Sequence, residues 1–143
     1  MTTTFRTDTS EGIYTVLAAY ALAHPDQLVR AYRARPGNIA QDLPCAFVDA
    51  FPEAVSHDSG TRTRTAQPSV VVVRAYTDNA EVAAAFDSLV DGLLDAFTAS
   101  PQFMPGTIWD KVSINDFEEQ VGDYLFPAVR FTFGNISIME GRV

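Results

Sequence analysis

Residues 69–76 read SVVVVRAY, and a segment with a helical pattern follows them directly, from Asp78 to about Ser100. Four consecutive valines in a short apolar run predict a buried strand. Apolar residues then recur at three- and four-residue intervals and form one stripe: Val82, Phe86, Leu89, Val90, Leu93, Leu94 and Phe97. Asp78 with Glu81 predicts the capped start of this helix, and Ser100-Pro101 predicts its end. A buried strand that leads into an amphipathic helix predicts a helix lying over a sheet.

Upstream, the sequence predicts a first helix and a kinked strand. The segment Asp8-Thr9-Ser10-Glu11 is typical of a capped helix start, and His24-Pro25 marks the helix end. Residues 28–33 are expected to be extended or to form a short second helix. Residues 45–55 predict one strand with a kink at Pro52.

Between these regions, residues 61–65 read TRTRT, a strict alternation of threonine and arginine. A period of two with polar residues on both faces predicts an exposed β ribbon with little core of its own. We expect it to form one arm of a projecting hairpin around residues 56–68. A long loop, mobile or bound to a partner, is the alternative.

After the long helix, residues 107–114, 125–133 and 136–138 alternate well enough to predict strands. Val121 and Tyr124 are expected at a turn or strand entrance. The chain thus predicts a single α+β domain over residues 1–143. Its mostly antiparallel sheet is expected to be covered on one face by the long helix and the N-terminal helix.

Composition restricts the possible functions. The net charge is −8 and the pI is about 4.5, which argues against a duplex-binding surface, because neutralising phosphates needs clustered Lys and Arg. Basic residues gather at residues 30–35 and 62–64, whereas residues 110–123 are strongly acidic. This segregation predicts either complementary faces between identical copies or solvated loops.

Cys45 is the single cysteine and is expected in the core. The amino-terminal residues lack a signal-peptide pattern, so we expect a soluble intracellular product.

Residue types with catalytic or metal-binding potential do not form a recognisable motif. His24 and His57 have no metal-ligand spacing and are expected at the surface or in a capping role. Asp116, Glu118, Glu119 and Asp123 could supply an acid/base pair or a cation site, but a solvated acidic loop is favoured. The aspartates 87, 91 and 95 are expected on an exposed helix face. No catalytic residue, cofactor or metal is therefore predicted.

The order of elements does suggest a family. An N-terminal helix is followed by the Leu43–Val48 strand, the Thr/Arg ribbon, the valine-rich strand, one long helix and a β pair entered through residues 124–129. Over residues 10 to 140 this pattern resembles the tail terminator proteins of long-tailed, siphovirus-like bacteriophages, and more loosely their neck and tail-completion proteins.

The resemblance implies a structural virion protein made in the host cytoplasm. It implies a homo-hexameric ring at the head-proximal end of the tail that ends tail-tube polymerisation and provides the docking surface for the head connector. The expected partners are the tail tube protein and the connector, DNA would pass through without specific binding, and neither enzyme activity nor a cofactor is expected.

The charged segments are the candidate interface. We expect Arg62 and Arg64 to reach a neighbouring subunit or the tube, or else to face DNA in the channel, and Asp116, Glu118 and Glu119 to lie in a subunit or partner interface. Two other classes remain open. A ligand-binding or enzymatic α+β cone would use Trp109, Tyr124 and Phe131 as pocket walls and form a dimer. A small adaptor would bind another protein through a sheet edge or the ribbon and stay monomeric without it.

Overall fold

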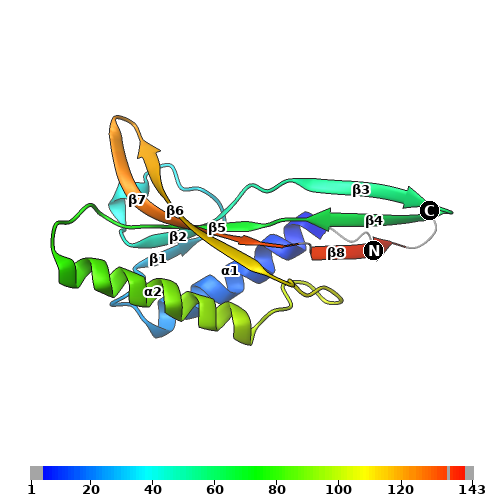
Figure 1. Cartoon of the computed structure of the whole chain (residues 1–143), viewed down its shortest axis with the longest axis horizontal. Helices are drawn as coiled ribbons and strands as arrows, with labels where there is room; N and C mark the ends of the chain where they lie inside the picture. The colour runs from blue at the N-terminus through cyan, green and yellow to red at the C-terminus, as the bar shows by residue number, and fades with distance from the viewer. Residues whose placement is uncertain (1–4, 135, 141–143) are drawn as a thin grey trace.

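A computed structural model describes residues 5–134 and 136–140 of the chain (Figure 1). Along the chain the elements are α1 (Phe5–Ala23), β1 (Arg30–Tyr32), the 3-10 helix η1 (Ile39–Gln41), β2 (Cys45–Asp49), β3 (Glu53–Asp58), β4 (Thr61–Ala66), β5 (Ser69–Val73), α2 (Ala80–Ala99), β6 (Val112–Val121), β7 (Tyr124–Phe133) and β8 (Ile136–Glu140). The predicted α+β class is confirmed.

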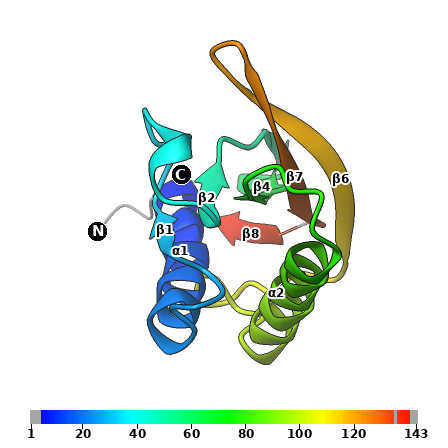
Figure 2. The same ribbon diagram turned by 90° about the vertical axis from the view of Figure 1, so that its left-hand side faces the viewer.

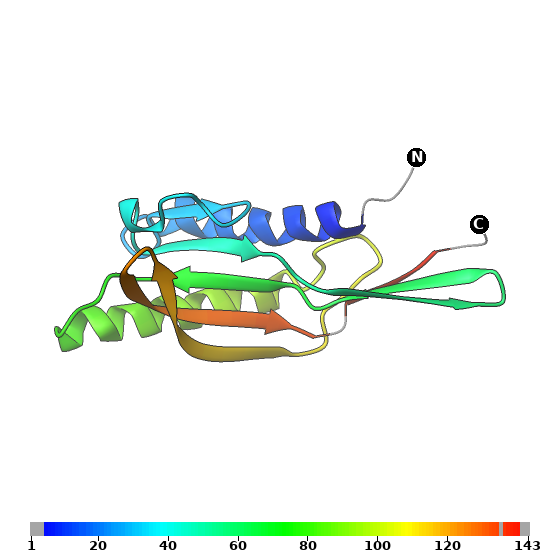
Figure 3. The same cartoon turned by 90° about the horizontal axis from the view of Figure 1, so that it is seen from above.

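The strands form two sheets. Five strands make the larger one in the order β1-β2-β5-β7-β6, in which only β1 and β2 run parallel. The smaller sheet has the order β3-β4-β8 and is antiparallel throughout. We call the five-stranded sheet with its two helices the body, and the three-stranded sheet the extension. The extension projects from one end of the body (Figures 1 and 3).

Both helices lie on one face of the body sheet, as predicted (Figure 2). Helix α2 buries Phe86, Leu89, Leu93 and Phe97, all of which belong to the predicted apolar stripe. The predicted cap is wrong by one residue: the Asn79 side chain accepts hydrogen bonds from the backbone N–H groups of Glu81 and Val82, at 2.8 and 3.3 Å. Asp78 instead accepts a hydrogen bond from the Tyr76 hydroxyl at 2.8 Å. An asparagine caps because its amide oxygen satisfies N–H groups that have no partner within the helix.

The core under the helices is aromatic at one end. The Phe97 ring packs edge-on against Phe103 and Phe133, with centroid distances of 5.8 and 4.9 Å. Trp109, expected in a strand, lies in the loop before β6 and packs against Phe133 at 5.4 Å. Helix α1 and the loop after α2 approach so closely that a Cβ on Gly12 would lie 1.8 Å from the carbonyl oxygen of Phe103. A glycine is therefore required at that contact.

The other face of the body sheet has a smaller core of its own. Its buried members are Ile39, Cys45, Phe47, Val71, Val73 and Ala128. Phe117, Val121 and Phe126 from the β6–β7 hairpin pack against this cluster. Strand β5 is consequently buried on both faces, as its valine run indicates, and the burial predicted for Cys45 is confirmed.

The extension confirms the predicted hairpin and corrects the strand before it. β3 and β4 pair along their whole length and turn at Ser59 and Gly60, which have φ values of 50° and 85°. Residues 45–55 are not one kinked strand but two strands, β2 and β3, which belong to different sheets. Pro52 lies at the change of sheet, where its missing N–H cannot continue a ladder.

The acidic segment after α2 also differs from the prediction. Strand β6 starts at Val112, so residues 107–111 precede it, and it continues to Val121. Asp116, Glu118 and Glu119 therefore lie in a strand rather than in a solvated loop. The sequence around them carries too many charges for a strand pattern, but pairing with β7 over ten residues holds this segment extended.

Candidate interaction surfaces

Strand β4, which carries the predicted interface residues Arg62 and Arg64, is the central strand of the extension. Because side chains alternate along a strand, Arg62 and Arg64 share one face of the extension, which we call the Arg face. By register with the neighbouring strands, this face comprises Glu53, Val55, His57, Arg62, Arg64, Ala66, Ile136 and Ile138. Its body-proximal end, at Ala66 and Ile136, is part of the main core.

Arg64 lies at the junction between the extension and the body, where it contacts both. Its Nε donates to Glu53, its guanidinium lies 5.3 Å from the centre of the Phe5 ring on α1, and its side chain is 19% exposed. Glu53 also pairs with Arg6 of α1 at 3.4 Å. One carboxylate thus joins a strand of the extension to the first turn of α1, so Arg64 has an internal partner besides any role at an interface.

The opposite face of the extension has a different character. It comprises Ala54, Ser56, Asp58, Thr61, Thr63, Thr65, Ser137 and Met139, and we call it the Thr face. The side chains are short except that of Met139, which is 72% exposed, and among the described residues of this face only Asp58, at the hairpin turn, is charged. The hydroxyls of Thr65 and Ser137 hydrogen-bond across the strands at 3.1 Å. This face is flat, nearly uncharged and open.

The predicted acidic residues do not act as one group. Asp116 and Glu118 are exposed, whereas Glu119 is only 6% exposed and forms an ion pair with Arg35, from the loop after β1. Arg35 also donates to the carbonyl of Gln120 at 3.1 Å. The end of β6 is thereby fastened over the second core to the opposite side of the sheet. Glu119 is an internal residue of the body.

Asp116 belongs to an acidic side of the body. It lines a cleft of about 260 Å³ between β6 and α2 together with Asp87 and Arg74. Arg74 places its guanidinium 5.3 Å from the centre of the Phe86 ring. Between Asp78 and Asp123 the sequence holds ten acidic residues and one basic residue, Lys111. The negative charge of the chain is therefore concentrated on α2 and β6.

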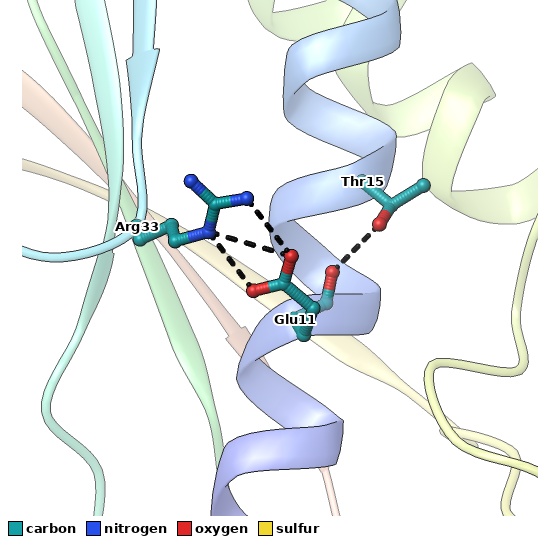
Figure 4. A network of polar contacts seen from close by, with 3 residues as sticks. All are labelled: Glu11, Thr15 and Arg33. Carbon is teal, nitrogen blue, oxygen red and sulfur yellow. Dashed lines mark hydrogen bonds and ion pairs between the residues drawn. The ribbon is translucent and has the colours of Figure 1, made fainter.

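Most arginines on the opposite side of the body are paired. Arg33 bonds Glu11 of α1 through Nε and Nη2, each at 3.1 Å, and its guanidinium lies 4.2 Å from the centre of the Tyr14 ring (Figure 4). The hydrogen bond from Arg33 lowers the pKa of the Glu11 carboxyl. Thr15 donates to the Glu11 carbonyl one turn back, at 2.8 Å. This exposed network fastens the chain just after β1 to helix α1, and similar pairs join Arg30 to Asp42 and Arg130 to Asp49.

One groove at the other end of the body is mostly apolar. It has a volume of about 430 Å³ and is lined by Leu43, Pro44, Val82, Ala85 and Phe86, with Asp26, Glu81 and Arg74 among its polar lining residues. It does not contain the predicted pocket walls. Tyr124 is 73% exposed at the tip of the β6–β7 hairpin, whereas Phe131 is fully buried under the helices.

Residue types suited to catalysis remain apart. His24 stacks on Tyr20 at the end of α1, with ring centroids 4.4 Å apart, and His57 is exposed on β3. Burial raises the pKa of the Cys45 thiol to about 11. Within residues 5–134 and 136–140, no three His, Cys, Asp or Glu side chains gather as a metal site would require.

The contacts that sequence reasoning missed are long-range. Arg35 and Glu119 lie far apart in the sequence, and no spacing rule relates them.

Neither described helix combines the length and apolarity needed to cross a bilayer. Compared with models of protein families and with curated protein sequences, the chain matches none.

Proposed function

We propose that this chain is a structural subunit of a long-tailed phage, which forms a ring at the head-proximal end of the tail, stops tail-tube polymerisation and offers a docking surface to the head connector. The observation that carries the proposal is the extension, a three-stranded sheet that joins the main core only at its base, at Ala66 and Ile136, and projects beyond it. The order of elements, in which an N-terminal helix, a ribbon, a buried strand and one long helix precede a β pair, supports the same assignment.

A sheet that is uncovered beyond its base suits assembly. Three strands are stable on their own only when they bury a hydrophobic face or pack against a helix. Here the β3 residues from Ala54 to Asp58 are all exposed, and so are Ser137 and Met139 of β8. A neighbouring subunit or tube ring would supply the missing layer.

The charge distribution fits a conduit for DNA. A wall with negative potential repels phosphates and prevents the duplex from sticking as it passes. Helix α2 and strand β6 carry an excess of carboxylates, including the exposed pair Asp87 and Asp116 beside one cleft. The ring would then conduct DNA without binding it specifically.

The test is negative-stain electron microscopy of the concentrated protein, alone and mixed with purified tail tubes that lack a terminator. Rings, or caps at one end of the tubes, are the expected result. Monomers beside bare tube ends would contradict the proposal. Rings that bind an isolated connector but leave tube ends bare would favour another neck component, such as a head-closure or tail-completion protein.

The apolar groove favours one second candidate, a small-molecule-binding domain. Grooves with apolar walls and a few polar groups are typical of ligand sites, and Arg74 and Glu81 would orient a ligand here. A thermal-shift screen tests this function, with Val82→Arg as the variant that blocks the groove. A ligand that raises the Tm of the unmodified chain but not of the variant would support it.

A further inference from the structure

The two faces of the extension differ in the number of charged groups they present. On the Arg face, Glu53, Arg62 and Arg64 are charged, and Arg64 and Glu53 bond each other and contact α1. On the Thr face, the described side chains are hydroxyl, methyl or thioether groups apart from Asp58 at the turn. The Arg face is therefore the one that contacts the body at its base. The Thr face is the open one.

The net charge limits where two copies of the chain can approach each other. Two copies with a net charge of −8 repel each other over most of their surfaces, and α2 and β6 carry the largest share of that charge. The Thr face is a part of the surface where this repulsion is nearly absent. Its short side chains also let a partner approach the strands closely, and the exposed Met139 supplies an adaptable apolar contact.

We propose that the Thr face is the surface on which a second copy of this chain packs. The inference rests on the proposed function in that it names one contact between subunits of the ring. It shifts the interface from Arg62 and Arg64 to the opposite side of the same strand, to Thr61, Thr63 and Thr65.

The face is too small to hold an isolated pair of copies by itself. Three strands about 4.8 Å apart and about six residues long present roughly 300 Å², whereas a stable interface buries about 800 Å² on each partner. One such contact is too small to hold two copies together. In a closed ring each copy has two neighbours, so several weak contacts act at once.

The first test places a carboxylate in the centre of the face. Thr63→Glu is expected to weaken self-association about a hundredfold, because an unpaired charge would be buried against an acidic neighbour. Ser113→Glu is the matched control, since Ser113 is an exposed strand residue of β6 in the body. Light scattering after size-exclusion chromatography measures both. Assembly of Thr63→Glu like the unmodified chain, or equal loss in Ser113→Glu, would overturn the inference.

A second test does not depend on how well a charged variant folds. Thr63→Cys introduces a small thiol, while Cys45 is fully buried and stays silent toward a maleimide reagent. The labelling rate at position 63 is expected to fall at least about tenfold from dilute to concentrated protein, which corresponds to about 1.4 kcal/mol of protection. Ser113→Cys should label at the same rate throughout. An unchanged rate at position 63 would refute packing on the Thr face.

The outcomes separate the two proposals. Capped tail tubes in which position 63 is not protected would support the proposed function and contradict packing on the Thr face. Protection of position 63 in an assembly that never caps tubes would support packing on the Thr face and contradict the proposed function. A chain that stays monomeric up to millimolar concentration, with position 63 equally reactive throughout, would contradict the packing of a second copy.

Discussion

The body and the extension are built from the same kind of strand pairing, but only the body sheet is covered. Valines of β5 are buried on both faces of the body, between two helices and the β6–β7 hairpin. The exposed strand β3 of the extension has neither layer. The difference shows that backbone pairing continues past the base of the extension, where Ala66 and Ile136 are buried, into a region with little burial. Most of the stability should therefore come from the body rather than from the extension.

The largest difference in the free energy of unfolding is expected between a variant of a core aromatic residue and a variant of an extension residue. Phe97→Ala should lower the free energy of unfolding by about 3–5 kcal/mol, because it leaves a cavity among Phe103, Phe131 and Phe133. Val55→Ala, at a half-exposed position of β3, should change it by less than about 0.5 kcal/mol. Urea denaturation measures both. A similar loss in the two variants would mean that the extension contributes to the folding core.

A glycine contact tests how tightly the body is closed. Gly12→Ala should cost about 3 kcal/mol, because its Cβ would lie 1.8 Å from a backbone oxygen that cannot move alone. Gly37→Ala is the control, since a Cβ there meets no atom within 4 Å. The Tm of both variants can be read by circular dichroism. An unchanged Tm for Gly12→Ala would show that α1 and the loop after α2 separate easily.

The ion pair between Arg35 and Glu119 holds the β6–β7 hairpin. Its loss is expected to cost less stability than a core cavity and more than a change in the extension. Arg35→Ala should cost about 2 kcal/mol, since it leaves the buried Glu119 carboxylate without its partner. Glu119→Gln should cost less, because a neutral amide can still accept from Arg35. Amide hydrogen exchange should accelerate at residues 119–126 in Arg35→Ala, while the extension stays unchanged. Acceleration throughout the chain would mean that the hairpin does not open separately.

Alkaline pH probes the second core through its thiol. The pKa of Cys45 is raised to about 11 in the folded state, so the unfolded chain loses the thiol proton first. The contribution of this group is fully present below about pH 9 and declines as the pH rises to 11. Unfolding experiments on the unmodified chain and on Cys45→Ala should converge over that window. A constant difference between them would show that the thiol is not shielded.

The smallest effect is expected for the exposed pair of Figure 4. Arg33→Ala should return the pKa of Glu11 to its ordinary range, which NMR titration of the carboxyl can follow. Because the folded pKa is lowered, the pair stabilises the fold above the ordinary pKa of glutamate and stops doing so as the pH falls through the folded value. Solvent screening keeps the gain small, as is usual for surface pairs. No change in the Glu11 titration would mean that the pair is open in solution.

Sequence reasoning succeeded where the signal was local. The stripe from Val82 to Phe97 predicted α2, and the TRTRT alternation predicted a projecting strand, because both patterns follow the geometry of one element. It failed for Asp116–Glu119, whose extended conformation depends on pairing with β7. The partners of Arg64 and Arg35 were also hidden, since each contact depends on how distant segments come together. Periodicity could not tell which face of the ribbon would stay open, because both faces are polar.

The joint between the sheets carries a mechanical consequence. Three central strands of the body, β2, β5 and β7, connect to β3, β4 and β8 of the extension through short segments that contain Pro52, Pro68 and Gly134. A force on the tip of the extension is thus divided among three covalent paths that enter the middle of the body sheet. A load on the extension would therefore reach three neighbouring strands under both helices at once rather than a single strand at the edge of the sheet.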